Sequence, residues 1–554
     1  MDTKRLLLFI IFSFSLVMLW DAWQKENRPA QQTATQPAGS QQAAKDSGVV
    51  APPARRPDGT PTPAEGAGVA GAAGEKIQIR TDLFVATINT QGGTLEKLEL
   101  TQHKDTVDRE KNLVLLGPDH RYEAQSGLTG AQGPNHRTIW QVVSPERELA
   151  AGKDSLEVRL AASGPDGVRV EKAYIFHRDS YRIDVGMKVR NEGAQAIEPH
   201  AYFQLTHDGT SPQGGSSLAQ SFGAQSFLGF AAFTQENKFQ KVAFSDVDKG
   251  KQNHVKQAGD GWLGFVQHYF VSAWLPPPGM QRDFVVEKRN DGIYVGRIVL
   301  GFPAIAAGQE AQLKVPLYAG PQEQRRLKEA APGLDLVVDY GWLAILAWPL
   351  FWLLQQMHAI SGNWGVAIIL LTVIIKLAFF PLSAASYRSM AKMKVITPRL
   401  TKLRETYGND RAKLNQAMMD LYKTEKINPL GGCFPILVQI PVFIALYWVL
   451  LAAIELRNAP FILWIKDLSA LDPYFVLPAL MAVTMVIQTR MNPKPPDPVQ
   501  AKVMAVMPFV FSIFFFFFPA GLVLYWLVNN ILSILQQWQI QRLFDRSRTA
   551  TAKR

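Results

Sequence analysis

Two long stretches without any charged residue constrain the fold of this chain more than any other feature. Residues 342–375 and 503–540 contain 34 and 38 consecutive uncharged residues. A helix needs roughly 20 apolar residues to cross about 30 Å of hydrocarbon, so each stretch is too long for a single crossing. The second half of the chain is therefore predicted to be an α-helical polytopic membrane protein, because helices satisfy their backbone hydrogen bonds internally.

Polar and turn-forming residues divide both stretches. Ser361-Gly362-Asn363 interrupts the first stretch, and Pro519-Ala520-Gly521 interrupts the second. Gly and Pro at such points indicate turns between helices. We predict an interfacial helix at 341–358 and transmembrane helices near 364–382, 433–454, 473–489, 503–518 and 521–540. These segments belong to a helical core at 326–545, which a basic tail at 546–554 follows.

The N-terminal segment is predicted to be a further span followed by a tether. Lys4-Arg5 precede an apolar run from Leu6 to Trp20. Such a run can be a cleaved signal peptide, but Trp20-Asp21-Ala22-Trp23 offers no small-x-small cleavage site, which favours an uncleaved anchor at 1–27. Residues 28–74 are rich in Gln, Ala, Pro, Gly and Thr and poor in large apolar residues, which predicts a disordered tether outside the cytoplasm.

Residues 75–325 carry the pattern of β-strands. The segment Tyr181–Arg190 alternates apolar and polar residues, which is typical of a strand with one buried face. Pro165-Asp166-Gly167 and Asn290-Asp291-Gly292 each lie between two such segments and indicate hairpin turns. We therefore predict an all-β domain, built as one large antiparallel sandwich.

The distribution of charge orients the predicted spans. The net charge of +11 lies in residues 383–554, which hold 20 Lys+Arg and 9 Asp+Glu. Basic residues outnumber acidic ones 10 to 4 in 383–432, 3 to 1 in 490–502 and 5 to 1 in 541–554, but not in 455–472. Because basic loops stay in the cytoplasm, both termini are predicted to be cytoplasmic. An excess confined to loops does not predict sequence-specific nucleic-acid binding.

The basic segment 383–430 is predicted to be a helical hairpin that projects into the cytoplasm. Pro398 is expected to break the helix, and Gly408-Asn409-Asp410 to turn the chain, with Asp410 as a helix cap. Apolar residues then recur at helical spacing, at Leu414, Met418, Leu421 and Tyr422.

Lys376 is the residue most indicative of function. It lies within the span predicted near 364–382, where a charge costs roughly 2.5–3.5 kcal/mol on insertion scales and is usually functional. The alternative is that its long stem reaches the cytoplasmic surface. Other polar residues at membrane depth could line a hydrated pocket with it, although each alone is more typical of an interhelical hydrogen bond. These residues are Thr372, Gln439, Asn529, Asn530 and Ser533.

The sequence offers little sign of catalysis or metal binding. It has no G-x-S-x-G, H-E-x-x-H or P-loop pattern. Cys433 is the single cysteine, which excludes an intrachain disulfide and argues against a zinc site. His207-Asp208 is an isolated pair that suits a structural or turn role. We therefore predict a protein that is not an enzyme and needs no cofactor or metal.

Several motifs in the helical half belong to a recognisable pattern. They are Asn363-Trp364-Gly365, Lys423-Thr424-Glu425-Lys426-Ile427-Asn428-Pro429-Leu430-Gly431-Gly432-Cys433-Phe434-Pro435, Gln439-Ile440-Pro441, Pro460-Phe461 with Trp464, Asp467-Leu468-Ser469, and Phe518-Pro519-Ala520-Gly521-Leu522-Val523-Leu524-Tyr525-Trp526. Over residues 340–545 the chain closely resembles the bacterial YidC membrane protein insertases. The anchor, tether and β domain are similar in arrangement to the Gram-negative members, whose periplasmic domain is a β-supersandwich.

The resemblance implies a function and a location. Members of this family insert nascent membrane proteins into the bacterial inner membrane, alone or with the Sec translocon, and help them fold. The expected partners are nascent membrane proteins, ribosome–nascent chain complexes, the Sec translocon and the lipid bilayer. The expected topology has six transmembrane helices, five of which form the insertase core, with a periplasmic β domain and cytoplasmic termini.

The resemblance also implies a site. The family has an intramembrane groove that contains a single arginine on the second span, and Lys376 occupies that position here. Because lysine is a point charge without the bidentate fork of arginine, the change favours a mechanism that needs only positive charge. The residues expected to line the groove are Lys376, Thr372, Gln439, Asn529, Asn530, Ser533, Tyr525 and Trp526. The residues expected to guide the apolar helix of a substrate are Phe434, Pro435 and Phe509.

Two other functions are compatible with parts of the sequence. A transporter or channel for an anionic solute would use Lys376 to bind the anion, but it predicts matching broken helices in two halves, and no such repeat is found. An exported enzyme or sugar-binding domain, tethered by the membrane half, would place the activity in the β domain instead.

Overall fold

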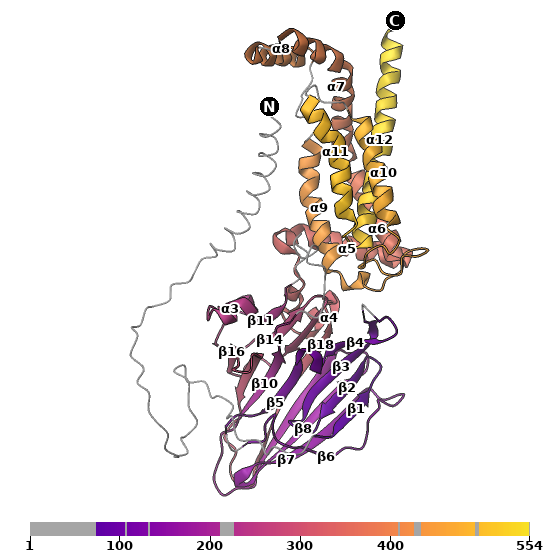
Figure 1. Cartoon of the computed structure of the whole chain (residues 1–554). Coiled ribbons are helices and arrows are strands. Elements are labelled where there is room, and N and C mark those ends of the chain that lie inside the picture. Colours follow the sequence, from indigo (N-terminus) through magenta and orange to yellow (C-terminus); the bar gives the residue numbers. More distant parts are fainter. Residues whose placement is uncertain are drawn as a thin grey trace, which may run out of the picture.

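The computed structural model describes residues 74–105, 108–130, 133–210, 227–407, 410–425, 434–492 and 498–552. The anchor predicted at 1–27, nearly all of the tether predicted at 28–74, and Cys433 lie outside these residues. The described chain has a β part followed by a helical part, and the two lie end to end (Figure 1).

The β part consists of two antiparallel sheets of nine strands each. The first sheet has the order β1-β2-β3-β5-β10-β17-β16-β13, with β4 paired to β3. Its strands are β1 Lys76–Arg80, β2 Phe84–Asn89, β3 Thr94–Lys104, β4 Asn112–Leu116, β5 Glu123–Leu128, β10 His200–His207, β13 Gln257–Ala258, β16 Arg282–Lys288 and β17 Tyr294–Gly301. The second sheet has the order β12-β11-β14-β15-β18-β9-β8-β7-β6. Its strands are β6 Gln141–Val142, β7 Ser155–Ser163, β8 Val168–His177, β9 Arg182–Asn191, β11 Gly229–Thr234, β12 Lys238–Ala243, β14 Trp262–Gln267, β15 Phe270–Trp274 and β18 Glu310–Pro321. The prediction of an antiparallel β domain is confirmed.

Both predicted hairpins are present. β7 and β8 pair across Pro165–Gly167, and β16 and β17 pair across the Asn290-Asp291-Gly292 turn. At the first turn Asp166 and Gly167 have φ angles of 57° and 74°. This left-handed conformation favours Asp and Gly, so the Asp-Gly pair sets the turn.

One lysine is buried in the core of the β part. Lys172 on β8 has no exposed surface, and its Nζ donates to the carbonyl oxygens of Gly92, Gly93 and Ser126 at 2.8, 3.2 and 2.8 Å. The amine also lies 4.4 Å from the centre of the Trp140 ring. Since Ser126 belongs to β5, this lysine links the two sheets.

The helical part is a bundle with one helix across its end. The helices that follow the β part are α4 Gln324–Ala330, α5 Ala344–Ser361, α6 Trp364–Ala378, α7 Phe380–Tyr407, α8 Arg411–Thr424, α9 Phe434–Ala452, α10 Val476–Met491, α11 Pro498–Phe515 and α12 Ala520–Ala552. α5, where an interfacial helix is predicted, lies across the end of the bundle that faces the β part (Figure 1).

The structure breaks the span predicted near 364–382. α6 ends at Ala378 and α7 begins at Phe380, with a bend of 67° between them. Within the described ranges no one helix has both the length and the composition of a membrane span, although the bent pair α6–α7 has them jointly. Three shorter apolar helical segments lie at Val438–Ala452, Val476–Met491 and Ala501–Phe515.

The predicted break at Pro398 is wrong, because α7 continues through this residue to Tyr407. A proline removes one helical N–H but need not end a helix that packing holds in place. Ile396 and Leu400, on either side of Pro398, are buried against Met418, Leu421 and Tyr422. The predicted cap is present, since Asp410 Oδ1 accepts the N–H of Lys413 at 3.1 Å and begins α8.

Candidate functional site

Lys376 lies in the last turn of α6, with its side chain turned into the bundle. Only 5% of the residue is exposed, and its Nζ donates to Ser533 Oγ on α12 at 2.7 Å. A buried ammonium requires polar partners, because burial removes its hydration. The hydroxyl of Ser533 supplies one such partner across 157 positions of sequence.

A stripe of polar side chains on α12 extends from this contact. Asn529, Ser533 and Gln537 are spaced four residues apart and therefore lie on one face of the helix. Ser533 Oγ donates to the carbonyl oxygen of Asn529 at 2.7 Å. Gln439 on α9 donates from Nε2 to Asn529 Oδ1 at 3.0 Å. The structure thus connects Lys376, Ser533, Asn529 and Gln439 across α6, α12 and α9.

Two of the predicted polar residues lie away from this chain of contacts. Asn530 donates from Nδ2 to Thr484 Oγ1 on α10 at 3.0 Å. The hydroxyl of Thr372 donates to the carbonyl oxygen of Ile368 at 2.6 Å, within its own helix. Both residues are buried, and both make the local hydrogen bonds that polar residues commonly make between or within packed helices.

Tyr525 and Trp526 lie one to two turns earlier on α12, among aromatic side chains. Trp526 stacks on Phe443 at a centroid distance of 4.8 Å and meets Phe515 edge-on at 4.3 Å. Tyr525 is 1% exposed, and its hydroxyl has no hydrogen-bond partner among the described residues. Tyr525 precedes Asn529 by one helical turn, so it extends the polar stripe of α12 toward the aromatic side chains around Trp526.

The residues expected to guide a substrate helix lie on α9 and α11. Phe434 and Pro435 form the first turn of α9, and Phe509 on α11 is 61% exposed. Other large apolar side chains of α11 are also exposed, namely Val506, Val510, Phe511 and Ile513. A continuous apolar surface of this kind requires lipid or an apolar partner against it.

Sequence reasoning missed two groups of polar side chains, one on α7 and one on α12. The Tyr387 side chain on α7 lies near Ser533, and Ser383 and Ser386 on the same helix are buried. Gln537 has no exposed surface and donates to Asn492 Oδ1 at 3.0 Å. The four-residue spacing of Asn529, Ser533 and Gln537 could have identified the last of these. In the described ranges no group of three or more His, Cys, Asp or Glu side chains is placed to hold a metal ion.

Comparisons with known proteins cover nearly the whole chain. The family model described as the YidC periplasmic domain matches residues 76–353, and that of the 60Kd inner membrane protein matches residues 356–547. The membrane protein insertase YidC of Methylobacillus flagellatus is 54% identical, over 99% of this chain and 98% of that protein. The insertase of the same name from Aromatoleum aromaticum is 52% identical, over 98% of both.

A solved structure is also similar, but more distantly. The crystal structure of an active YidC insertase with its first transmembrane domain resolved aligns with 84% of this chain and 94% of its own, at 16% identity and a TM-score of 0.38. The assignment rests on the sequence matches, which span both the β part and the helical part. The chain therefore belongs to the YidC family of membrane protein insertases, a family of insertases rather than enzymes.

Proposed function

We propose that this protein inserts nascent membrane proteins into the bacterial inner membrane and helps them fold, alone or with the Sec translocon. The observation that carries the proposal is the position of Lys376, whose amine is buried and bonded to the neutral hydroxyl of Ser533. Among the described residues no carboxylate pairs with this amine, and a buried cation of that kind is suited to receive an anionic group from another molecule. The names of the relatives support the same activity.

The helices suit a topology with six transmembrane helices, five of them in the insertase core. α9 has 19 residues, a length of about 28 Å, which is close to the hydrocarbon thickness of a bilayer. In this topology the first span is the N-terminal anchor at 1–27, and the β domain lies in the periplasm. The α7–α8 hairpin and both termini lie in the cytoplasm, as the excess of basic residues in 383–432 favours.

The hydrogen-bonded polar side chains around Lys376 lower the free-energy cost of moving a polar segment across the membrane. A charged or polar segment is expensive in hydrocarbon because it loses its hydration. Lys376, Ser533, Asn529 and Gln439 offer donors and acceptors in its place. An acidic segment of the substrate pairs transiently with Lys376, and the membrane potential favours its outward movement. In this proposal Thr372, Asn530, Tyr525 and Trp526 form the walls of the groove.

The apolar helix of the substrate leaves along a different surface. Phe509 and its neighbours on α11 expose large apolar side chains, and Phe434 and Pro435 form the first turn of α9. The helix slides along this surface into lipid, and burial of its apolar side chains drives the step. No nucleotide is needed for a step that is favourable in this way.

The α7–α8 hairpin receives the substrate on the cytoplasmic side, from the ribosome–nascent chain complex. The hairpin has a small apolar core around Leu400, and its surface exposes Met419 and Tyr407 among basic residues. Flexible methionine side chains fit apolar segments of varied shape. The basic residues suit a partner with an acidic surface.

Replacing Lys376 tests the charge mechanism. We expect Lys376→Ala to reduce insertion of a small single-span substrate with an acidic exported segment by roughly 10- to 100-fold, since a charged hydrogen bond contributes about 1.5–3 kcal/mol. Lys376→Arg should retain insertion because it keeps the charge. The measurement is protease protection of the substrate in proteoliposomes that contain the full chain.

The control is Lys402→Ala, which removes an exposed lysine of α7 without touching the buried site. Its insertion activity should equal that of the unaltered chain. Equal activity of Lys376→Ala and Lys376→Arg would rule out a role for the charge. A substrate whose exported segment is neutral should be affected less by Lys376→Ala than the acidic one.

A further inference from the structure

The β domain touches the helical part at a second place besides the chain connection through α4 and α5. The loop between α9 and α10, residues 453–475, meets the edge of the β domain there. Arg457 Nη2 donates to the carbonyl oxygen of Lys104 at 2.6 Å, and Arg109 lies 3.8 Å from Asp467. At the end of α9, His268 Nε2 donates to the carbonyl oxygen of Leu451 at 3.2 Å.

Arg457 and Asp467 are buried residues of the loop whose charged groups contact the β domain. Each of the two is 8% exposed. The guanidinium lies 5.5 Å from the centre of the Phe270 ring, on β15 of the β domain. Burial lowers the pKa of Arg457, while the charges of Asp467 and Asp105 act in the opposite direction. A guanidinium remains charged in such a setting, so its partners must stay in place to compensate for lost hydration.

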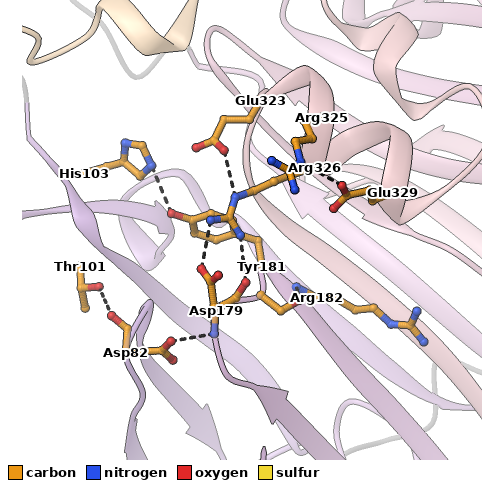
Figure 2. Close-up of polar contacts among 11 residues, drawn as sticks. Asp82, Thr101, His103, Asp179, Tyr181, Arg182, Glu323, Arg325, Arg326 and Glu329 are labelled. Atoms are coloured by element: carbon orange, nitrogen blue, oxygen red, sulfur yellow. Dashed lines mark hydrogen bonds and ion pairs between the residues drawn. The ribbon is translucent and has the colours of Figure 1, made fainter. Parts of the chain in front are cut away.

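The contacts of Arg457 continue through the β domain to α4. The Phe270 ring meets the His103 ring edge-on at 5.4 Å, and His103 Nε2 lies 3.3 Å from the hydroxyl of Tyr181. Figure 2 shows this pair beside Arg326, whose guanidinium lies 5.2 Å from the centre of the Tyr181 ring. The row of side chains therefore joins the loop contact to the first helix of the chain connection.

Arg326 is itself held by several acceptors. Its Nη1 and Nη2 donate to the carbonyl oxygen and the carboxylate of Asp179 at 2.9 and 3.0 Å, and its Nε donates to Glu323 at 2.9 Å (Figure 2). The backbone N–H of Asp179 in turn donates to the carboxylate of Asp82 at 2.7 Å, and this hydrogen bond fixes the position of Asp179. α4 is thus fixed to the turn between β8 and β9 and cannot swing freely.

We infer that Arg457 is a positioning residue that holds the β domain in one orientation on the helical part. A domain joined by a single chain connection can rotate about it, because interfaces within a chain are often small. The loop contact gives a second attachment point. The packed side chains from Phe270 to Arg326 make the part of the β domain between this contact and α4 rigid. A buried charge adds little net stability but penalises other orientations, in which it would lose its acceptor.

The distance between spin labels on the two parts tests this inference. Labels are placed at Lys153→Cys in the β domain and Gln356→Cys on α5, both exposed positions, in the full chain with Cys433→Ser. Double electron–electron resonance of the otherwise unaltered chain in nanodiscs should give one narrow distance distribution. Arg457→Met keeps the apolar stem and removes the guanidinium, so the single narrow peak should be lost.

The controls separate orientation from folding. Arg325→Met removes an arginine of α4 that lies next to Arg326 in the sequence. Its side chain is 89% exposed and pairs with Glu329 on the surface, so this variant should leave the narrow peak unchanged. Arg457→Lys, which keeps a charge and one donor, should restore much of the peak. The near-ultraviolet circular dichroism of Arg457→Met should match that of the unaltered chain. A narrow peak in Arg457→Met, or a broad distribution in the unaltered chain, would overturn the inference.

Discussion

Two buried lysines show how differently the same side chain can be used. Lys172 in the β domain donates to three backbone carbonyl oxygens, which matches the three donors of an ammonium. Lys376 in the bundle donates to one hydroxyl, that of Ser533. The first is a saturated structural group; for the second, Ser533 is the acceptor found among the described residues, and we propose that its other donors serve the substrate. Lys172 lies at an inward position of the strand Val168–His177, so the alternation of apolar and polar residues along this strand predicts its burial.

Removing the amine of Lys172 should destabilise the β domain strongly. Lys172→Met leaves three buried carbonyl oxygens without this donor, and we expect a loss of about 3 kcal/mol in the free energy of unfolding. Lys188→Met is the matched control, since Lys188 is 45% exposed and bonds Glu310 at 2.8 Å on the surface; it should cost less than about 1 kcal/mol. Thermal unfolding of the full chain, followed by near-ultraviolet circular dichroism, measures both. Similar losses in the two variants would contradict the structural role of Lys172.

At the scale of elements, the apolar pattern predicts where membrane segments lie but does not fix where the helices end. The end of the apolar run near Ile540 marks where a span should leave the bilayer, but α12 continues to Ala552. Its last residues are compatible with a helix in water, so loss of hydropathy does not imply loss of helix. The bend between α6 and α7 was missed for a related reason. Phe379 and Pro381 lie inside an apolar run, and hydropathy does not record the local backbone geometry.

The α7–α8 hairpin illustrates the same point, because tertiary packing decides its helix lengths. We expect Leu400→Ala, which truncates a residue that is 2% exposed, to loosen α8 from α7 by on the order of 2 kcal/mol. Hydrogen exchange of the α8 amides should then accelerate by roughly 30-fold. Lys402→Ala, two residues away and exposed, should not change it. Unchanged exchange in Leu400→Ala would show that α8 is held by contacts other than this small core.

At the scale of the whole molecule, the sequence predicted each half but not how the halves meet. Local periodicity reaches only neighbouring turns and strands, whereas the Arg457–Lys104 contact joins residues 353 positions apart. The candidate site has the same limit. Lys376 stood out because it interrupts an apolar run, but its pairing with Ser533 depends on the packing of α6 against α12. The placement of Trp526 in an aromatic cluster also follows from packing.

Buried histidines should make the β domain sensitive to acid. Burial lowers the pKa of His103, His136, His207 and His254 from 6.5 to about 4 in each case. The unfolded chain binds protons at these groups near pH 6.5, whereas the folded chain does so only near pH 4. Their contribution to stability is therefore complete above pH 6.5 and is lost as the pH falls from 6.5 to 4. Each group accounts for about 3 kcal/mol at most.

One carboxyl in the loop between α9 and α10 opposes this trend. Burial raises the pKa of Glu455 from 4.5 to about 7, so the folded chain holds a proton there that the unfolded chain releases, and this favours folding at lower pH. Burial also raises the pKa of Glu123 in the β domain, but the four histidines outweigh these two carboxyls, and the β domain should still lose stability between pH 6.5 and 4.5. The thermal midpoint of unfolding of the full chain, measured at several pH values across this range, gives the dependence of stability on pH.

Replacing one histidine identifies the groups responsible. His103→Gln removes a single titrating group, so about one proton fewer is taken up on unfolding. The slope of the unfolding free energy against pH should then fall by about 1.4 kcal/mol for each pH unit at its steepest. The charges of Arg457 and Arg326 help lower the pKa of His103, so Arg457→Met should also flatten the slope, though by less. Lys188→Met changes no group that titrates between pH 4 and 6.5 and should leave the slope unaltered. A midpoint independent of pH from 7.5 to 5 would mean that these rings are hydrated in the folded protein, and the packing described around them would be incorrect.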